Sequence, residues 1–112
     1  MSGMVREISE SEYEQAVAAK SGVAVLDFYS TECPPCEALA PKYEALAEQF
    51  AERIQFFKIF RQGNKALAQR LGVTGSPTLV FFRDGKEVGE RMTGELKRSE
   101  LKQRLTALLE PA

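Results

Sequence analysis

Residues 23–36 read VAVLDFYSTECPPC, and this stretch decides the fold of the chain. Its first half, residues 23–29, is an apolar run that is interrupted only by the carboxylate of Asp27. A run this apolar predicts a strand that is covered on both faces, as in a parallel sheet. The second half ends in Cys33 and Cys36, the only two cysteines among the 112 residues. The pair is therefore expected just beyond the end of a buried strand.

The two cysteines are spaced so that one sulfur can reach the other, and a helical pattern runs from them to about residue 52. Backbone N–H groups and the helix dipole at a helix N-terminus favour a thiolate over a thiol. A disulfide here would close a loop too small to restrain the unfolded chain much, so redox chemistry or metal binding explains the pair better. Zinc needs about four ligands and the chain has no histidine, so a zinc site would require thiolates pooled from two chains.

Length and composition restrict the class of protein. A chain of 112 residues forms one domain, which we expect to span residues 1–112. The net charge of -1 and the lack of a basic run argue against nucleic acid and anionic membranes as partners. No apolar stretch approaches a membrane span in length, and the N-terminus lacks the pattern of a secretory signal. We therefore expect a cytoplasmic monomer.

The remaining patterns predict the element order β-α-β-α-β-α-β-β-α, a mixed α/β sheet with helices on both faces. Strands are expected at residues 4–8, 23–29, 54–60, 78–82 and 87–92, the last two joined as a hairpin. Helices are expected at residues 11–20, from the cysteines to about residue 52, at 65–71 and around 101–109. Ser11 and Glu14 fit a capping box for the first helix, and Asn64 is expected to cap the third.

Taken together, these features resemble the thioredoxin family over nearly the whole chain. The resemblance is carried by Asp27-Phe28, Cys33-Pro34-Pro35-Cys36, Pro41, Lys58, Gly75-Ser76-Pro77-Thr78, Asp84-Gly85 and Gly94. It implies a thioredoxin fold, with a five-stranded mixed sheet of order 1-3-2-4-5 flanked by four helices. It also implies a cis peptide bond between Ser76 and Pro77 that faces the disulfide.

Four residues are candidates for the chemistry. Its place at the helix start predicts that Cys33 is the nucleophile with an exposed sulfur, while Cys36, one turn later, is the shielded resolving thiol. Burial would raise the pKa of Asp27 toward neutrality, and the resemblance implies that Asp27 accepts the proton of Cys36 through a water. Asp27 could instead be an internal hydrogen-bonding acid. Lys58 would tune Asp27 from the neighbouring strand or would extend to solvent.

A second group of residues is expected to bind substrate around the cysteines. These are Glu32, Pro34, Pro35, Gly75, Ser76, Pro77 and Gly94. A cis bond before Pro77 would expose the backbone of Ser76 to an extended substrate strand, whereas the simpler interpretation is a proline tolerated at a strand entrance.

Several of these positions depart from the family pattern. Glu32 replaces the usual aromatic residue, Pro34-Pro35 replaces Gly-Pro, and Ser76 replaces an aliphatic residue. The acidic residue common after the third-strand lysine is also missing, since Phe60-Arg61 stands there. The two prolines remove N–H donors near Cys33 and are expected to push Cys33 and Pro34 toward extended geometry. All of these differences lie at or near the partner-facing surface.

The expected function is reduction of disulfides in protein substrates, without metal or organic cofactor, followed by resetting of the pair by an upstream disulfide reductase. Three alternatives stay open. The chain could be a redox-inert binding module that recruits partners through the groove at Pro77. It could be a disulfide oxidase or isomerase. It could also form a dimeric metal site with four thiolates.

Overall fold

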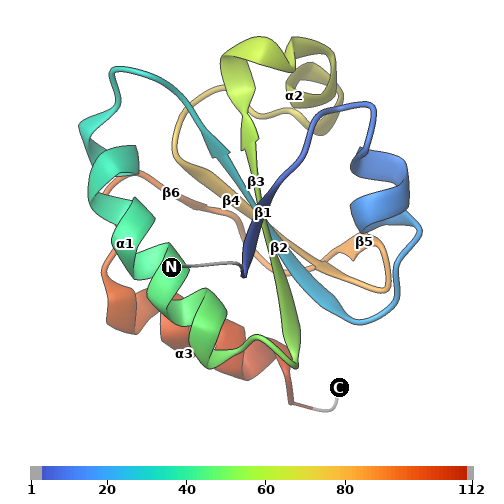
Figure 1. Cartoon of the computed structure of the whole chain (residues 1–112), viewed down its shortest axis with the longest axis vertical. Helices are drawn as coiled ribbons and strands as arrows, with labels where there is room; N and C mark the ends of the chain where they lie inside the picture. The colour runs from blue at the N-terminus through green and yellow to red at the C-terminus, as the bar shows by residue number, and fades with distance from the viewer. Residues whose placement is uncertain (1–3, 111–112) are drawn as a thin grey trace.

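The computed structural model describes residues 4–110, so residues 1–3 and 111–112 of the expected domain lie outside the described part. Its centre is a sheet with strand order β1-β3-β2-β4-β5, in which β6 also pairs with β4 (Figure 1). The strands are β1 (Val5–Glu7), β2 (Val23–Tyr29), β3 (Ile54–Phe60), β4 (Thr78–Arg83), β5 (Lys86–Glu87) and β6 (Met92–Thr93). β1, β3 and β2 are parallel, whereas β4 runs antiparallel to β2. The expected mixed sheet and its order are confirmed.

Helices cover both faces of this sheet, as Figure 1 shows. They are the π-helix η1 (Glu14–Ala18), α1 (Pro34–Gln49), α2 (Lys65–Leu71) and α3 (Arg98–Leu108), with a short 3-10 turn, η2 (Arg61–Gly63), before α2. The buried side chains of α1 and α3 form one apolar cluster, and those of η1 and α2 form another on the opposite face. Among residues 4–110, no helix has the length and apolar character that a membrane span requires.

Strand β2 lies between the two clusters, because successive side chains of a strand point to opposite faces. Leu26 and Phe28, both fully buried, belong to the cluster under η1 and α2. Val25 belongs to the cluster under α1 and α3. Asp27 is two residues from Val25, so its carboxylate points to the same face, toward α1. In the parallel register Asp27 lies beside Lys58 of β3. This alternation places a carboxylate beneath the helix that begins at the cysteines.

The single strand expected at residues 87–92 is wrong. Two short strands, β5 and β6, pair separately with β4. Between them Gly89 has a φ of 71°, a left-handed conformation that interrupts an extended strand. The sheet therefore has six strands in the described residues rather than five, although the hairpin turn at Asp84-Gly85 forms as expected.

The capping box expected at the first helix is also wrong. Ser9, two residues earlier, contacts Glu12 instead: its backbone N–H donates to Glu12 Oε1 at 2.9 Å and its hydroxyl donates to the same oxygen at 3.1 Å. Glu14 instead forms an exposed ion pair with Arg70 of α2. The local spacing of Ser and Glu fits both positions, so it does not select between them.

The cap of α2 comes from a distant segment rather than from Asn64. The side chain of Asn64 accepts a hydrogen bond from the N–H of Glu10 at 2.8 Å and donates one to the carbonyl of Phe60 at 2.8 Å. The N–H of Leu67, in the first turn of α2, donates to Glu10 Oε1 at 3.0 Å. A carboxylate therefore satisfies the helix N-terminus, a favourable position for negative charge, but it lies 57 residues away in the chain.

Candidate functional site

Cys33 is the N-cap residue of α1 and is joined by a disulfide to Cys36, with a Cα–Cα distance of 5.2 Å. Cys33 has φ −131° and ψ 88°, which is not helical, as expected for a residue before proline, but does not reach the fully extended region. The same expectation for Pro34 is wrong, because Pro34 is the first residue of α1, where the φ of proline already fits a helix. The cysteines therefore lie at a helix N-terminus, as the sequence pattern predicts.

Pro34 and Pro35 leave the first turn of α1 with few donors, since neither has a backbone N–H. The N–H of Cys36 is the first that the helix offers, and it donates to Cys33 Sγ at 3.3 Å. This one N–H is the hydrogen-bond donor to the Cys33 sulfur in the described part of the chain. The helix N-terminus therefore supports a thiolate on Cys33 less strongly than a first turn with three free donors would.

The loop before β4 faces the disulfide. The peptide bond between Ser76 and Pro77 is cis, as expected, and Cys33 Sγ lies 3.5 Å from the carbonyl oxygen of Ser76. The Thr78 hydroxyl donates to the carbonyl of Gly75 at 2.8 Å and closes the loop. Gly75 is exposed, Ser76 is half-buried and Pro77 is buried. The disulfide and the backbone of Ser76 therefore lie side by side.

The expected difference in exposure between the cysteines is not present in the disulfide form. Cys33 is 7% exposed and Cys36 is 8% exposed. What distinguishes them is their surroundings. Cys33 faces Ser76 at the surface loop, whereas Cys36 lines a partly open cavity together with Asp27.

That cavity has a volume of about 410 Å³ and runs beneath the start of α1. Asp27, which is 6% exposed, lines it, and its Oδ1 atom has no hydrogen-bond partner among the described residues. Burial raises the pKa of Asp27 from 3.8 to about 7, and the charge of Lys58 acts in the opposite direction. Asp27 can therefore exchange a proton near neutral pH in the same cavity as Cys36.

Lys58 also lines this cavity, beside Asp27 in the register of β2 and β3. Its Nζ atom lies 5.7 Å from the centre of the Tyr29 ring, and no ion pair joins it to Asp27 in the described residues. Lys58 therefore acts on Asp27 through its charge across the cavity, without direct contact. The side chain of Lys58 is half-buried, and its role toward Asp27 stays a prediction.

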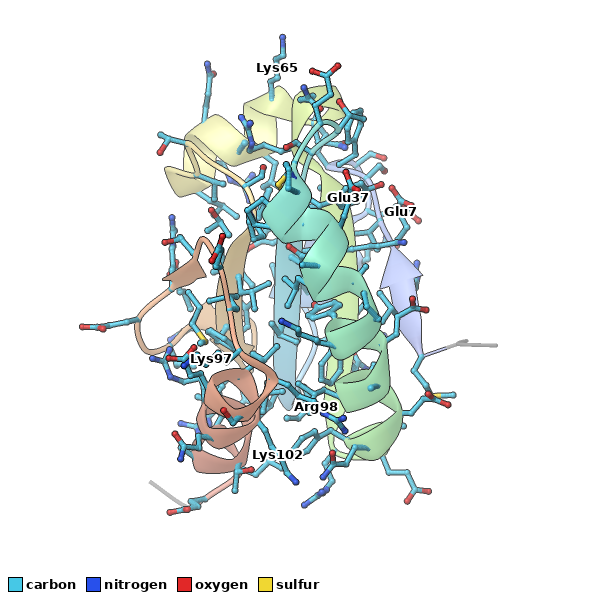
Figure 2. All side chains as sticks on the ribbon, turned by 90° about the vertical axis from the view of Figure 1, so that its left-hand side faces the viewer. Glu7, Glu37, Lys65, Lys97, Arg98 and Lys102 are labelled. Carbon is cyan, nitrogen blue, oxygen red and sulfur yellow. A yellow bond between two sulfur atoms is a disulfide. The ribbon has the colours of Figure 1, made fainter. Side chains whose placement is uncertain are left out.

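The other predicted binding residues surround the disulfide. Glu32 is exposed, has a φ of 52° and lies at the cavity that holds Asp27. Pro34 and Pro35 line a separate hollow with Leu96. Gly94 follows β6, whose Thr93 pairs with Thr78, so Gly94 lies at the same end of the sheet as Pro77. Figure 2 shows the disulfide near the start of α1, with Glu37 close to it on the same helix.

The turn η2 contributes two contacts that sequence reasoning missed. Gln62 Oε1 accepts hydrogen bonds from the N–H and the hydroxyl of Thr31, both at 3.0 Å, and so holds the loop before the cysteines. Arg61 Nε donates to Ser76 Oγ at 2.8 Å. Arg61 and Ser76 both depart from the family pattern, and these departures were the only sign in the sequence that the two positions are unusual. Nothing in the local sequence indicates that the two side chains meet.

Comparison with known proteins identifies the family. The thioredoxin family model matches residues 4–107. The chain belongs to the thioredoxin family. It is 33% identical over 108 residues to chloroplastic thioredoxin X of Arabidopsis thaliana, covering 96% of this chain and 59% of that protein. It is 40% identical over 80 residues to thioredoxin-2 of Saccharomyces cerevisiae, covering 71% of this chain and 76% of that one.

A solved structure gives the same result for the fold. A mutant thioredoxin from Halobacterium salinarum NRC-1 superposes with a TM-score of 0.86 at 35% identity, covering 96% of this chain and 93% of that chain. The thioredoxin fold is therefore confirmed. The chain also spans 17% of protein disulfide-isomerase A3 of Gallus gallus at 35% identity over 85 residues. Family membership and the Cys33–Cys36 disulfide together support a thiol–disulfide oxidoreductase.

Proposed function

We propose that this chain reduces disulfides in protein substrates, with Cys33 as nucleophile and Cys36 as resolving thiol. The observation that carries the proposal is the cavity shared by Asp27 and Cys36, because it provides a base of pKa about 7 on the side of the resolving cysteine. A covalent exchange of this kind needs no metal or organic cofactor.

In the first step the thiolate of Cys33 attacks one sulfur of the substrate disulfide. A mixed disulfide forms between Cys33 and the substrate, and the other substrate sulfur leaves as a thiolate that takes a proton from solvent. The N–H of Cys36 stabilises the attacking thiolate, because it already donates to Cys33 Sγ at 3.3 Å. The loop with Gly75, Ser76 and Pro77 lies against the same sulfur and offers its backbone to the substrate.

In the second step Cys36 resolves the mixed disulfide. The carboxylate of Asp27 accepts the proton of the Cys36 thiol, and the resulting thiolate attacks Cys33 Sγ. The second substrate sulfur leaves reduced, and the Cys33–Cys36 disulfide is restored. Lys58 keeps part of the Asp27 population ionised at neutral pH by opposing the effect of burial. An upstream disulfide reductase then supplies two electrons to the pair.

The direction of the chemistry follows from the weak support for the Cys33 thiolate. A strongly oxidising couple requires a very acidic nucleophilic thiol. Here two prolines remove donors from the first turn of α1, and the carboxylate of Glu32 lies nearby. We therefore expect a reduction potential between about −200 and −280 mV, on the reducing side of the known range. We further propose that the protein acts as a cytoplasmic monomer.

Two measurements test this proposal. The purified chain, recycled with dithiothreitol, should accelerate the reduction of insulin, and the absence of any acceleration would favour a redox-inert binding module. Equilibration in glutathione buffers should give the potential of the Cys33–Cys36 couple. A value above about −150 mV would overturn the reductase assignment in favour of an oxidase or isomerase.

A further inference from the structure

Arg61 and Ser76 form a polar pair beside the disulfide. Arg61 Nε donates to Ser76 Oγ at 2.8 Å, and the carbonyl oxygen of the same serine lies 3.5 Å from Cys33 Sγ. The two residues come from different loops, η2 and the segment before β4, and both are half-buried. The guanidinium of Arg61 is therefore held beside the site, and Ser76 lies between it and the reactive sulfur.

The bond to Ser76 uses only one of the five N–H donors of the guanidinium. In the described part of the chain, the ion pairs of arginine join Arg6 to Glu12, Arg70 to Glu14 and Arg91 to Glu87, and none involves Arg61. Because the hydrogen bond engages Nε, the two terminal nitrogens remain as a fork. A planar fork of this kind matches a carboxylate in a bidentate geometry.

The charges around the disulfide are arranged asymmetrically. Glu32 and Glu37 line the cavity on the side of β2 and α1. Arg61 lies at the loop of Ser76 and is followed by the exposed Lys65 at the start of α2. Figure 2 shows Lys65 and Glu37 at the same end of the molecule as the sulfur atoms. A segment bound at the disulfide therefore meets two carboxylates at the cavity and a guanidinium at the loop of Ser76.

We propose that Arg61 determines substrate specificity by binding a carboxylate that flanks the reactive disulfide of the partner protein, with Ser76 as its positioning residue. The inference rests on the proposed function, since it concerns the disulfide that Cys33 attacks. Because the Ser76 carbonyl lies 3.5 Å from Cys33 Sγ and Arg61 binds the same serine, a residue next to the attacked cysteine can come within reach of Arg61. An Asp or Glu there forms a charge-assisted pair, whereas a Lys or Arg is repelled.

A purely structural role for Arg61 makes a different prediction. If the bond to Ser76 only ordered the loop before β4, loss of Arg61 would slow the reaction with every substrate by the same factor. A specificity role changes the ratio between substrates that differ in charge. The ratio is therefore the readout that separates the two.

The experiment uses disulfide-bonded peptides that are identical except for an Asp, Asn or Lys next to the attacked cysteine. One set of three has this residue before the cysteine, and a second set has it after the cysteine. For the native chain we expect kcat/KM to be roughly 3–10-fold higher for the Asp peptide than for the Asn peptide on one of the two sides. The preference should fall as salt is added, because the pair is partly exposed. Arg61→Gln should abolish it, and Arg61→Glu should reverse it in favour of Lys.

Arg53→Gln is the matched control, because Arg53 follows α1 at the opposite end of the sheet and should leave the preference unchanged. Ser76→Ala keeps the charge of Arg61 but removes the acceptor of its hydrogen bond, so it should weaken the preference for the Asp peptide. This variant also tests the inference if the Arg61 variants fail to fold. An equal loss on all three peptides, or an unchanged preference in Arg61→Gln, would overturn the inference. Peptides reduced by the native chain at equal rates would overturn it too, whereas no reduction of any peptide would instead contradict the proposed function.

Discussion

On the face of the sheet under η1 and α2, β2 contributes Ala24, Leu26 and Phe28, all of them buried among apolar side chains. On the face under α1 and α3, the same strand contributes Val25 and Asp27. Both faces have an apolar cluster, but the second also carries a carboxylate at the wall of a cavity. Because side chains alternate along a strand, one element can supply stability on one face and chemistry on the other.

The carboxylate makes the second face costly. A rise in the pKa of Asp27 from 3.8 to about 7 corresponds to a loss of stability on the order of 4 kcal/mol at alkaline pH. A typical domain is stable by only about 5–15 kcal/mol, so this is a large fraction. The apolar clusters on the two faces have to offset this cost. The difference between the faces therefore has consequences that mutations can separate.

The largest expected effect is on turnover. Cys33→Ser should abolish insulin reduction while it changes the unfolding free energy of the reduced protein by less than about 1 kcal/mol, because the substitution is small and lies at the N-cap. Cys36→Ser should retain the first step and accumulate mixed disulfides, which mass spectrometry would detect. Turnover that persists in Cys33→Ser would show that the assigned nucleophile is wrong.

The next effect compares the same substitution on the two faces. Leu26 and Leu79 are both fully buried, but Leu79 lies opposite Asp27 on β4, whereas Leu26 belongs to the cluster under η1 and α2. Leu26→Ala and Leu79→Ala should each cost about 3 kcal/mol in urea unfolding, because each leaves a cavity.

Only Leu79→Ala should also change the chemistry. The space it opens beside Asp27 lessens the effect of burial, so the pKa of Asp27 should move down from about 7 toward its ordinary value. The carbon resonance of the Asp27 carboxyl group, followed by NMR against pH, measures this. Equal titration curves in the two variants would mean that the faces are not separated as described.

The third prediction concerns Asp27 itself. Its pKa in the folded protein lies above its ordinary value of 3.8, so between pH 4 and pH 7 the folded state binds more protons than the unfolded state. The native protein should therefore lose stability as the pH rises through this range. Asp27→Asn lacks this loss. Its free energy of unfolding should exceed that of the native protein by roughly 2–4 kcal/mol at pH 8, but not at pH 3.

The same substitution should slow the resolution of the mixed disulfide. The rate of the native protein should rise with pH through about 7 as Asp27 becomes a carboxylate, and the variant should lack this inflection. Glu44→Gln is a suitable control, because it also converts a carboxylate to an amide at the same cavity but at an exposed residue. Parallel stability curves for Asp27→Asn and the native protein would show that burial does not perturb Asp27.

Local pattern was sufficient for most of the elements on both faces. The strands at residues 23–29 and 54–60 and the helix at 65–71 have the predicted bounds, because each has a strong apolar pattern between clear turn residues. The strand at 87–92 failed because Gly89 adopts a left-handed conformation that the sequence only permits. The cap expected at α2 is wrong because Glu10, rather than Asn64, reaches the first turn of that helix.

Some contacts of the site could also be predicted from the sequence, and others could not. The meeting of Asp27 and Cys36 was predictable, because the strand, the helix start and the family resemblance all place them together. The contacts of η2 were not, because Arg61 and Ser76 lie 15 residues apart and Gln62 and Thr31 lie 31 apart. Side-chain hydrogen bonds between separate loops leave no periodic signal in a sequence.

The smallest expected effect concerns Lys58, which shares the cavity with Asp27 but forms no direct ion pair with it in the described residues. Lys58→Met keeps the aliphatic length of the side chain and removes the charge that opposes the effect of burial. The pKa of Asp27 should therefore rise further above about 7, by roughly 0.5–1 unit for a cation acting across a partly hydrated cavity. The inflection in the resolution rate should move to higher pH by the same amount.

Lys65→Met removes an exposed lysine on α2 and should leave the inflection where it is. If the inflection of Lys58→Met also stays in place, Lys58 serves the surface and the Tyr29 ring rather than Asp27, and the chemistry on this face depends on burial alone.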